Sequence, residues 1–114
     1  MSRLIGSQSE AQAVHYLEGL GYSCLTTNFH SAKGEIDLIV QSKSEELIFV
    51  EVKYRRTLDD RVFESITHRK RQAIIHAAKT FLLKHKLRYS TVSFGLLVHD
   101  PIGWHWLPDA FDGE

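Results

Sequence analysis

The fold of this chain is decided by two apolar runs, Gly34-Glu35-Ile36-Asp37-Leu38-Ile39-Val40 and Leu47-Ile48-Phe49-Val50-Glu51-Val52-Lys53. Both runs are short and rich in β-branched residues, and the polar stretch 41–46 separates them, which predicts two paired β-strands joined by a hairpin loop. The second run begins with four consecutive apolar residues, so it is expected at the sheet centre, buried on both faces. In the first run, alternation predicts that Ile36, Leu38 and Val40 share one face, opposite Glu35, Asp37 and Ile39.

Three charged side chains interrupt these apolar strands. Glu51 and Lys53 lie two residues apart and therefore share one face, and Asp37 lies on the neighbouring strand. Burying an unpaired carboxylate is costly, and two neighbouring carboxylates repel each other. A bound Mg²⁺ or Mn²⁺ ion would resolve both problems, because these hard cations prefer oxygen ligands. The alternative is an ion pair of Lys53 with Glu51 or with Asp37.

A helix is predicted over Ser9–Leu20, where apolar residues recur at helical spacing. Ser7 or Ser9 can cap its start, and Gly21 follows as a C-terminal stop. Glu10 falls on the same side of this helix as the apolar residues. It is either a further metal ligand or a residue whose stem packs while its carboxylate reaches solvent.

The remaining elements follow from the same patterns, and residues 55–64 are expected to form a polar loop. Ser65 or Thr67 can cap a long helix. The expected elements are a strand over Tyr22–Phe29, a helix from Thr67 to about Lys86, and strands over Thr91–His99 and Trp104–Leu107. The predicted order is α-β-β-β-α-β-β in one domain over residues 1–114, which places the chain in the α/β class.

Length and composition favour an ordinary globular protein, since the chain has 114 residues and 43% are hydrophobic. No apolar run approaches the roughly 18 residues of a membrane span, and the N-terminus lacks the apolar stretch of a secretory signal. The single cysteine, Cys24, cannot form an internal disulfide and is expected as a buried thiol. These features favour a cytoplasmic protein without membrane partners.

The zero net charge conceals a strong asymmetry. Residues 52–88 contain eleven basic and three acidic residues, a net charge of +8, and the rest of the chain carries −8. This segment is either a solvated helix face or a surface that binds phosphates. It begins beside the proposed site, which favours nucleic-acid contact, and the expected binding residues are Arg55, Arg56, Arg61, Arg69, Lys70 and Arg71.

The two strand motifs also carry a family resemblance. Gly34-Glu35-Ile36-Asp37-Leu38-Ile39 and Phe49-Val50-Glu51-Val52-Lys53-Tyr54-Arg55-Arg56 resemble the YraN-type family of small bacterial proteins. That family belongs to the PD-(D/E)XK restriction-endonuclease-like superfamily and is similar to archaeal Holliday junction resolvases. The resemblance covers nearly the whole chain, including Gly6-x-x-x-Glu10, Ile66-Thr67-x-x-Lys70 and Trp106-x-x-Asp109-Ala110-Phe111. It implies a restriction-endonuclease-like (tRNA endonuclease-like) three-layer fold with a central mixed β-sheet.

The resemblance also implies roles for individual residues. Asp37 and Glu51 would hold Mg²⁺ or Mn²⁺, and Lys53 would position the attacking water or stabilise charge on the phosphate. Glu10 would support the metal site, and Glu35 would either support it or face solvent. Similarity to resolvases suggests a homodimer and a role in DNA repair or recombination.

One segment departs from the family pattern: Ser93-Phe94-Gly95 stands where the family tends to have Arg-Phe-Asp. Either a structural ion pair or a substrate-side contact is lost there. The expected function is a divalent-metal-dependent endonuclease that hydrolyses phosphodiester bonds in DNA, including branched or flapped DNA. The alternatives are a catalytically silent nucleic-acid-binding module and a partner subunit that keeps the nuclease fold.

Overall fold

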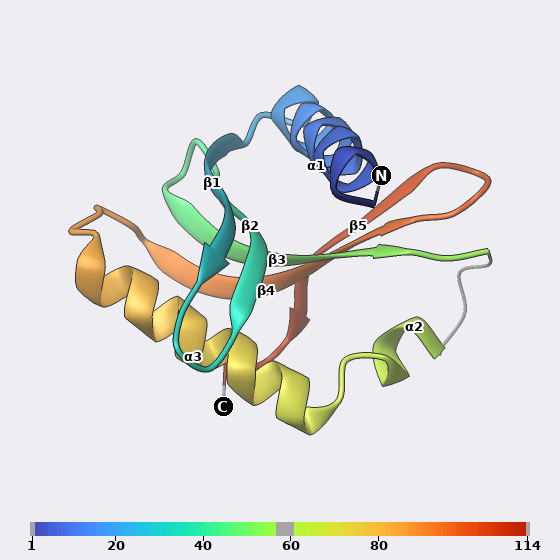
Figure 1. The fold of residues 1–114 in the computed structure, drawn as a ribbon. Coiled ribbons are helices and arrows are strands. Elements are labelled where there is room, and N and C mark those ends of the chain that lie inside the picture. Colours follow the sequence, from blue (N-terminus) through green and yellow to red (C-terminus); the bar gives the residue numbers. More distant parts are fainter. Residues whose placement is uncertain (1, 57–60, 114) are drawn as a thin grey trace.

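The computed structural model of the chain describes residues 2–56 and 61–113 (Figure 1). The helices are α1 (Ser2–Gly19), α2 (Arg61–Glu64) and α3 (His68–Lys84), and the strands are β1 (Ser23–His30), β2 (Glu35–Gln41), β3 (Glu46–Tyr54), β4 (Thr91–His99) and β5 (Trp104–Phe111). The predicted order of the main elements is therefore confirmed, with the short α2 added inside the predicted loop. Residues 57–60 of that loop lie outside the described residues.

The five strands form one mixed sheet in the order β1-β2-β3-β4-β5. Neighbouring strands are antiparallel except β3 and β4, which are parallel. A parallel pair needs a long crossover, and α3 lies in that connection. Helix α1 covers one face of the sheet and α3 the other (Figure 1). The chain thus has the predicted three-layer α/β architecture, with β3 at the sheet centre.

Each face of the sheet has its own apolar core. On one face, Ala13 and Leu17 of α1 pack among β-strand residues such as Val50. On the other, Phe81 of α3 packs against Phe49, with ring centroids 5.9 Å apart. Burying a side chain of this size stabilises a fold by about 1.5–3 kcal/mol. The two cores hold β3 between them, so residues at its carboxyl end are placed by both layers.

Helix α1 begins earlier than predicted and ends at Gly19, one residue before the predicted Leu20. It starts at Ser2, so Ser7 and Ser9 lie inside the helix and neither precedes it as a cap. At its end, the Tyr22 N–H donates to the Leu17 carbonyl at 3.1 Å, and the Gly21 N–H donates to the Glu18 carbonyl at 3.0 Å. This is the Schellman arrangement, and Gly21 adopts its positive φ of 103°.

Strand β2 breaks the predicted alternation at Asp37. Ile36 packs in the core beneath α3, whereas Leu38 and Val40 pack in the core beneath α1. The expectation that these three residues share a face is therefore wrong. The β2–β3 pairing runs from Gln41↔Leu47 only as far as Leu38↔Val50. The change of face thus coincides with the point where the two strands stop pairing.

The Gly95 position is closely packed. A Cβ atom built there would lie 2.9 Å from a Trp106 ring carbon and 3.0 Å from Ile48 Cγ2. Strand β5, which carries Trp106, lies at the sheet edge, and it continues through Pro108 beyond its predicted end at Leu107. An edge strand tolerates proline because one side of its backbone needs no partner. The Ser93-Phe94-Gly95 departure therefore coincides with an apolar contact across β4.

Candidate active site where β2 and β3 diverge

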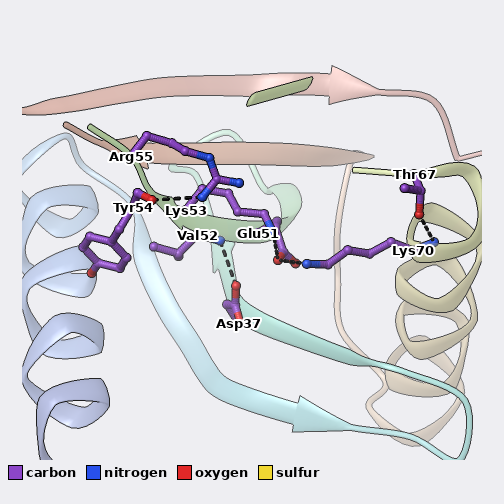
Figure 2. A network of polar contacts seen from close by, with 8 residues as sticks. All are labelled: Asp37, Glu51, Val52, Lys53, Tyr54, Arg55, Thr67 and Lys70. Carbon is purple, nitrogen blue, oxygen red and sulfur yellow. Dashed lines mark hydrogen bonds and ion pairs between the residues drawn. The ribbon is translucent and has the colours of Figure 1, made fainter. Parts of the chain in front are cut away.

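Asp37 lies at the point of divergence and takes over a backbone role. The Val52 N–H donates to Asp37 Oδ2 at 2.8 Å (Figure 2). Had the pairing continued past Leu38↔Val50, Ile36 would be the next partner of Val52. The Asp37 carboxylate instead accepts the hydrogen bond from the Val52 N–H that a carbonyl of the neighbouring strand would otherwise accept. This contact fixes Asp37 beside the carboxyl end of β3.

Glu51 is buried in the same place and is contacted by two ammonium groups. The Glu51 residue as a whole is 8% exposed. Glu51 Oε1 lies 2.8 Å from Lys70 Nζ and 3.4 Å from Lys53 Nζ. Figure 2 shows the Lys70 side chain reaching from α3 across to Glu51. The structure therefore contains the Lys53–Glu51 ion pair expected as one alternative, and adds a second and shorter pair.

The environment of Asp37 makes its negative charge unfavourable. Burial raises its pKa most, and the neighbouring Glu51 charge raises it further, to about 6. The hydrogen bond from Val52 and the Lys70 charge act in the opposite direction but do not compensate. The charge of Asp37 is therefore left partly uncompensated by its surroundings.

The two lysines are shifted in opposite directions. Burial and the neighbouring Lys70 lower the pKa of Lys53. Burial also lowers that of Lys70, but its hydrogen-bonding contacts with Glu51 and Lys53 outweigh it and raise the pKa overall. Two ammonium groups that converge on one carboxylate oxygen repel each other. A phosphate oxygen placed between them would relieve that repulsion.

Lys70 is held in place by the start of α3. Thr67 caps the helix, and its Oγ1 accepts a hydrogen bond from the Lys70 N–H at 3.2 Å. The cap confirms one of the two predicted start residues. The sequence suggested that Lys70 binds nucleic acid, because it lies in the basic segment. Its place on Glu51 could not be read from spacing, since the contact joins a helix start to a distant strand end.

The donor set fits a hard divalent cation. Within residues 2–56 and 61–113, Asp37 Oδ1 has no hydrogen-bond partner, which leaves it free to bind a cation. Mg²⁺ commonly takes one or two carboxylates and completes its shell with waters and substrate phosphates. Asp37 and Glu51 meet that requirement. In the same described residues, no group of three or more carboxylate, histidine or cysteine side chains could hold a metal ion, so Glu10 does not join them.

Glu10 and Glu35 occupy different surroundings. Glu10 is half-buried on α1. Glu35 is exposed at the start of β2, where its Oε2 lies 3.3 Å from His30 Nδ1. Its charge still raises the pKa of Asp37, as the smallest of the causes. The position of Glu35 agrees with the alternative in which it faces solvent, although its charge still influences Asp37.

The basic residues divide among several surfaces around the site. Arg55 follows β3, and its Nη1 donates back to the Tyr54 carbonyl at 2.9 Å. Arg56 and Arg61 are exposed. Arg69 and Arg71 flank Lys70 on α3 but line two separate hollows. Of the predicted set, Arg55 and Arg56 directly follow β3 and Lys70 contacts Glu51 on it, whereas Arg69 and Arg71 line separate hollows.

Known relatives span almost the whole chain. Residues 9–94 match the model of uncharacterised protein family UPF0102. The chain is 36% identical to a UPF0102 protein of Serratia proteamaculans, with 98% of this chain and 97% of the relative aligned. It is 37% identical to one of Hahella chejuensis, with 94% and 89% aligned. It is 35% identical to one of Dictyoglomus turgidum, with 94% and 96% aligned. No helix within the described residues is long and apolar enough to cross a membrane.

Proposed function

We propose that this chain, which belongs to uncharacterised protein family UPF0102, is a divalent-metal-dependent endonuclease that hydrolyses phosphodiester bonds in DNA. Its membership of that family confirms the family resemblance. The observation that carries the proposal is the juxtaposition of Asp37 and Glu51. Two neighbouring carboxylates, one of them with a raised pKa, meet two lysine ammonium groups at the end of a central strand. This combination suits a cation and a phosphate bound side by side.

Each residue has a chemical role in this proposal. Asp37 and Glu51 would hold Mg²⁺ or Mn²⁺, which would polarise the scissile phosphate and lower the pKa of a bound water. Lys53 is 14% exposed at its side chain and contacts Glu51 from the same strand. Its ammonium is placed to orient the attacking water or a nonbridging phosphate oxygen. Lys70 approaches the same carboxylate from α3 and supplies a second positive charge for the phosphate.

The surrounding basic residues support a nucleic-acid substrate. Residues 52–88 carry a net charge of +8, and the site lies at the beginning of this segment. Such a surface binds backbone phosphates independently of sequence and with affinity that falls as salt rises. No base-reading element was recognised in the sequence, so recognition of DNA structure, such as a branch or flap, suits the chain better than base readout. A homodimer would match a two-fold symmetric substrate.

The test is cleavage by purified protein with Mn²⁺ or Mg²⁺. Labelled junction, flap, duplex and single-stranded DNA are incubated with the wild-type chain and with Asp37→Asn, purified in parallel to control for contaminating nucleases. We expect cleavage of at least one substrate by the wild type, and its loss in Asp37→Asn and in EDTA. Absence of cleavage across all substrates, or equal cleavage by the variant, would contradict the proposal that the protein is an endonuclease.

A second candidate is a nucleic-acid-binding module that does not cleave. It is favoured by one observation: Lys70 and Lys53 already neutralise Glu51 without a metal ion. A chain that has given up catalysis could keep this ion-pair network as structure. Salt-sensitive DNA binding without cleavage, and without Mn²⁺ binding that depends on Asp37, would identify this alternative.

A further inference from the structure

A hollow of about 410 Å³ lies between the β1–β2 turn and α3, beside the candidate site. The turn passes alongside α3 in Figure 1. Lys33 lines the hollow from the turn. The α3 residues that line it include Arg69, Gln72, His76 and Lys79. Of these residues, only Arg69 belongs to the set that the sequence suggested for nucleic-acid binding.

The walls of the hollow are held at fixed separation. Gly34 approaches the α3 backbone so closely that a Cβ atom would lie 2.4 Å from the Ala73 carbonyl oxygen. Ser31 Oγ lies 3.3 Å from His76 Nδ1, which joins the turn to the helix a second time. Within the turn, the Ser31 N–H donates to the Gly34 carbonyl at 2.8 Å. The hollow is therefore preformed, and a ligand need not order it.

The lining has the charge of an anion site. Lys33, Arg69 and Lys79 carry permanent positive charges, His76 gains one when protonated, and Gln72 offers amide N–H donors. Among the described residues, no carboxylate lines the hollow. Clustered cations without a counter-charge favour a phosphate, and Arg69 can bind one through two parallel N–H donors.

The position of the hollow indicates which phosphate it takes. Gly34 precedes Asp37 by three residues on the same chain segment, which corresponds to roughly 10 Å of strand. Arg69 precedes Lys70, whose ammonium lies 2.8 Å from Glu51. The turn before β2 and the start of α3 thus border both the hollow and the Asp37–Glu51 site.

We propose that this hollow binds a backbone phosphate of the same nucleic-acid strand that enters the Asp37–Glu51 site. The inference rests on the proposed function, because it takes the strand at that site as its starting point. It adds Lys33, Gln72, His76 and Lys79 to the binding surface and gives Arg69 a defined partner. The hollow sets how the strand lies across α3, and the catalytic groups set where it is cut.

The test compares two charge-matched triple variants in EDTA, so that no cleavage is needed. One variant carries Lys33→Gln, Arg69→Gln and Lys79→Gln. The control carries Lys43→Gln, Lys84→Gln and Lys86→Gln, all of which replace exposed residues outside the hollow. Fluorescence anisotropy measures affinity for a labelled single strand and its duplex at KCl concentrations from about 50 to about 200 mM. Circular dichroism and thermal unfolding verify that each variant folds.

We expect the hollow variant to bind about tenfold more weakly at low salt, with a slope of log affinity against log salt that is smaller by about 1, as for one lost phosphate contact. The control keeps the wild-type slope. Equal binding by the hollow variant and wild type, an equal loss in the control, or no binding by the wild type overturns the inference. Cleavage with hollow-independent binding leaves the proposed function standing. DNA binding that depends on the hollow, without cleavage, contradicts the proposed endonuclease activity but supports the phosphate site in the hollow.

Discussion

Asp37, where β2 and β3 diverge, and Asp100, which follows β4, are two carboxylates that the same fold treats in opposite ways. Asp100 is 4% exposed, accepts hydrogen bonds from the Ile102 and Gly103 N–H groups, and lies 3.0 Å from His105 Nε2. Its pKa lies below the ordinary value, chiefly because of the polar contact with His105 and then because of the backbone donors. Asp37 has one backbone donor and a like-charged neighbour, and its pKa is raised to about 6.

The difference separates a carboxylate whose charge the fold stabilises from one whose charge it leaves partly uncompensated. The contacts of Asp100 stabilise its charge and close the β4–β5 turn. Asp37 has a charge that its single backbone donor and the Lys70 ammonium do not fully compensate. An aspartate in that state gains stabilisation from a cation, which is the requirement of a metal site.

The largest expected effect is on cleavage, where only one of the two aspartates should matter. Asp37→Asn keeps an acceptor for the Val52 N–H but removes a charged metal ligand, and we expect cleavage to fall by roughly 10³-fold, about 4 kcal/mol in activation free energy. Asp100→Asn should cleave at close to the wild-type rate. Single-turnover assays with Mn²⁺ measure both. A comparable loss of cleavage in both variants would mean that the substitutions act by disrupting the fold.

The next effect is on stability, where the two substitutions should act with opposite sign. The folded pKa of Asp37 is about 6 and its unfolded value 3.8, so its charge disfavours the folded state above pH 6, and this cost fades as pH falls toward 3.8. Asp37→Asn should therefore raise the free energy of unfolding at pH 8 by on the order of 2 kcal/mol, with a smaller gain at pH 4.5. Urea titrations at the two pH values measure this.

Asp100→Asn provides the opposite arm of the stability experiment. Because the folded pKa of Asp100 is depressed, its charge contributes stability above the unfolded value of 3.8, and this contribution is lost as pH falls through the folded pKa. Its replacement should destabilise the protein at neutral pH, and the deficit should shrink in acid. Destabilisation by Asp37→Asn at pH 8 would contradict the interpretation of Asp37 as an uncompensated charge.

The smallest expected effect concerns Lys70, the helix residue that partly compensates the site. Its ammonium lies 2.8 Å from Glu51 Oε1 and opposes the approach of a cation. Lys70→Met should therefore tighten Mn²⁺ binding by about tenfold, or about 1.4 kcal/mol. Isothermal titration calorimetry measures the affinity, with Lys84→Met as the matched control on the same helix. Weaker Mn²⁺ binding in Lys70→Met alone would show that Lys70 organises the metal ligands.

The strands and the layer order could be predicted because they depend on local pattern. The bounds of β4 over Thr91–His99 and the Thr67 cap agree with the sequence. Gly21 ends the first helix because glycine adopts the positive φ that the Schellman arrangement requires. The start of α1 was misplaced, since serines that can cap a helix can also lie within one.

The details of the site were less accessible because they depend on tertiary structure. Strict alternation placed Ile36 on the wrong face, since the strand changes face where Asp37 replaces a backbone partner. The contact between Lys70 and Glu51 depends on where the crossover helix begins relative to β3. The hollow beneath Lys33 depends on the Gly34–Ala73 approach, which no spacing rule reveals.

The groups proposed for catalysis and phosphate binding in the site and the hollow all come from the continuous stretch between Lys33 and Lys79, whereas β4 and β5 lie beside it in the sheet. Trp106 fills the space beside Gly95, so apolar packing occupies that part of the sheet. This division would allow related sequences to vary in their C-terminal strands while selection conserves the residues of the central stretch. Variation among relatives should then concentrate after Lys79.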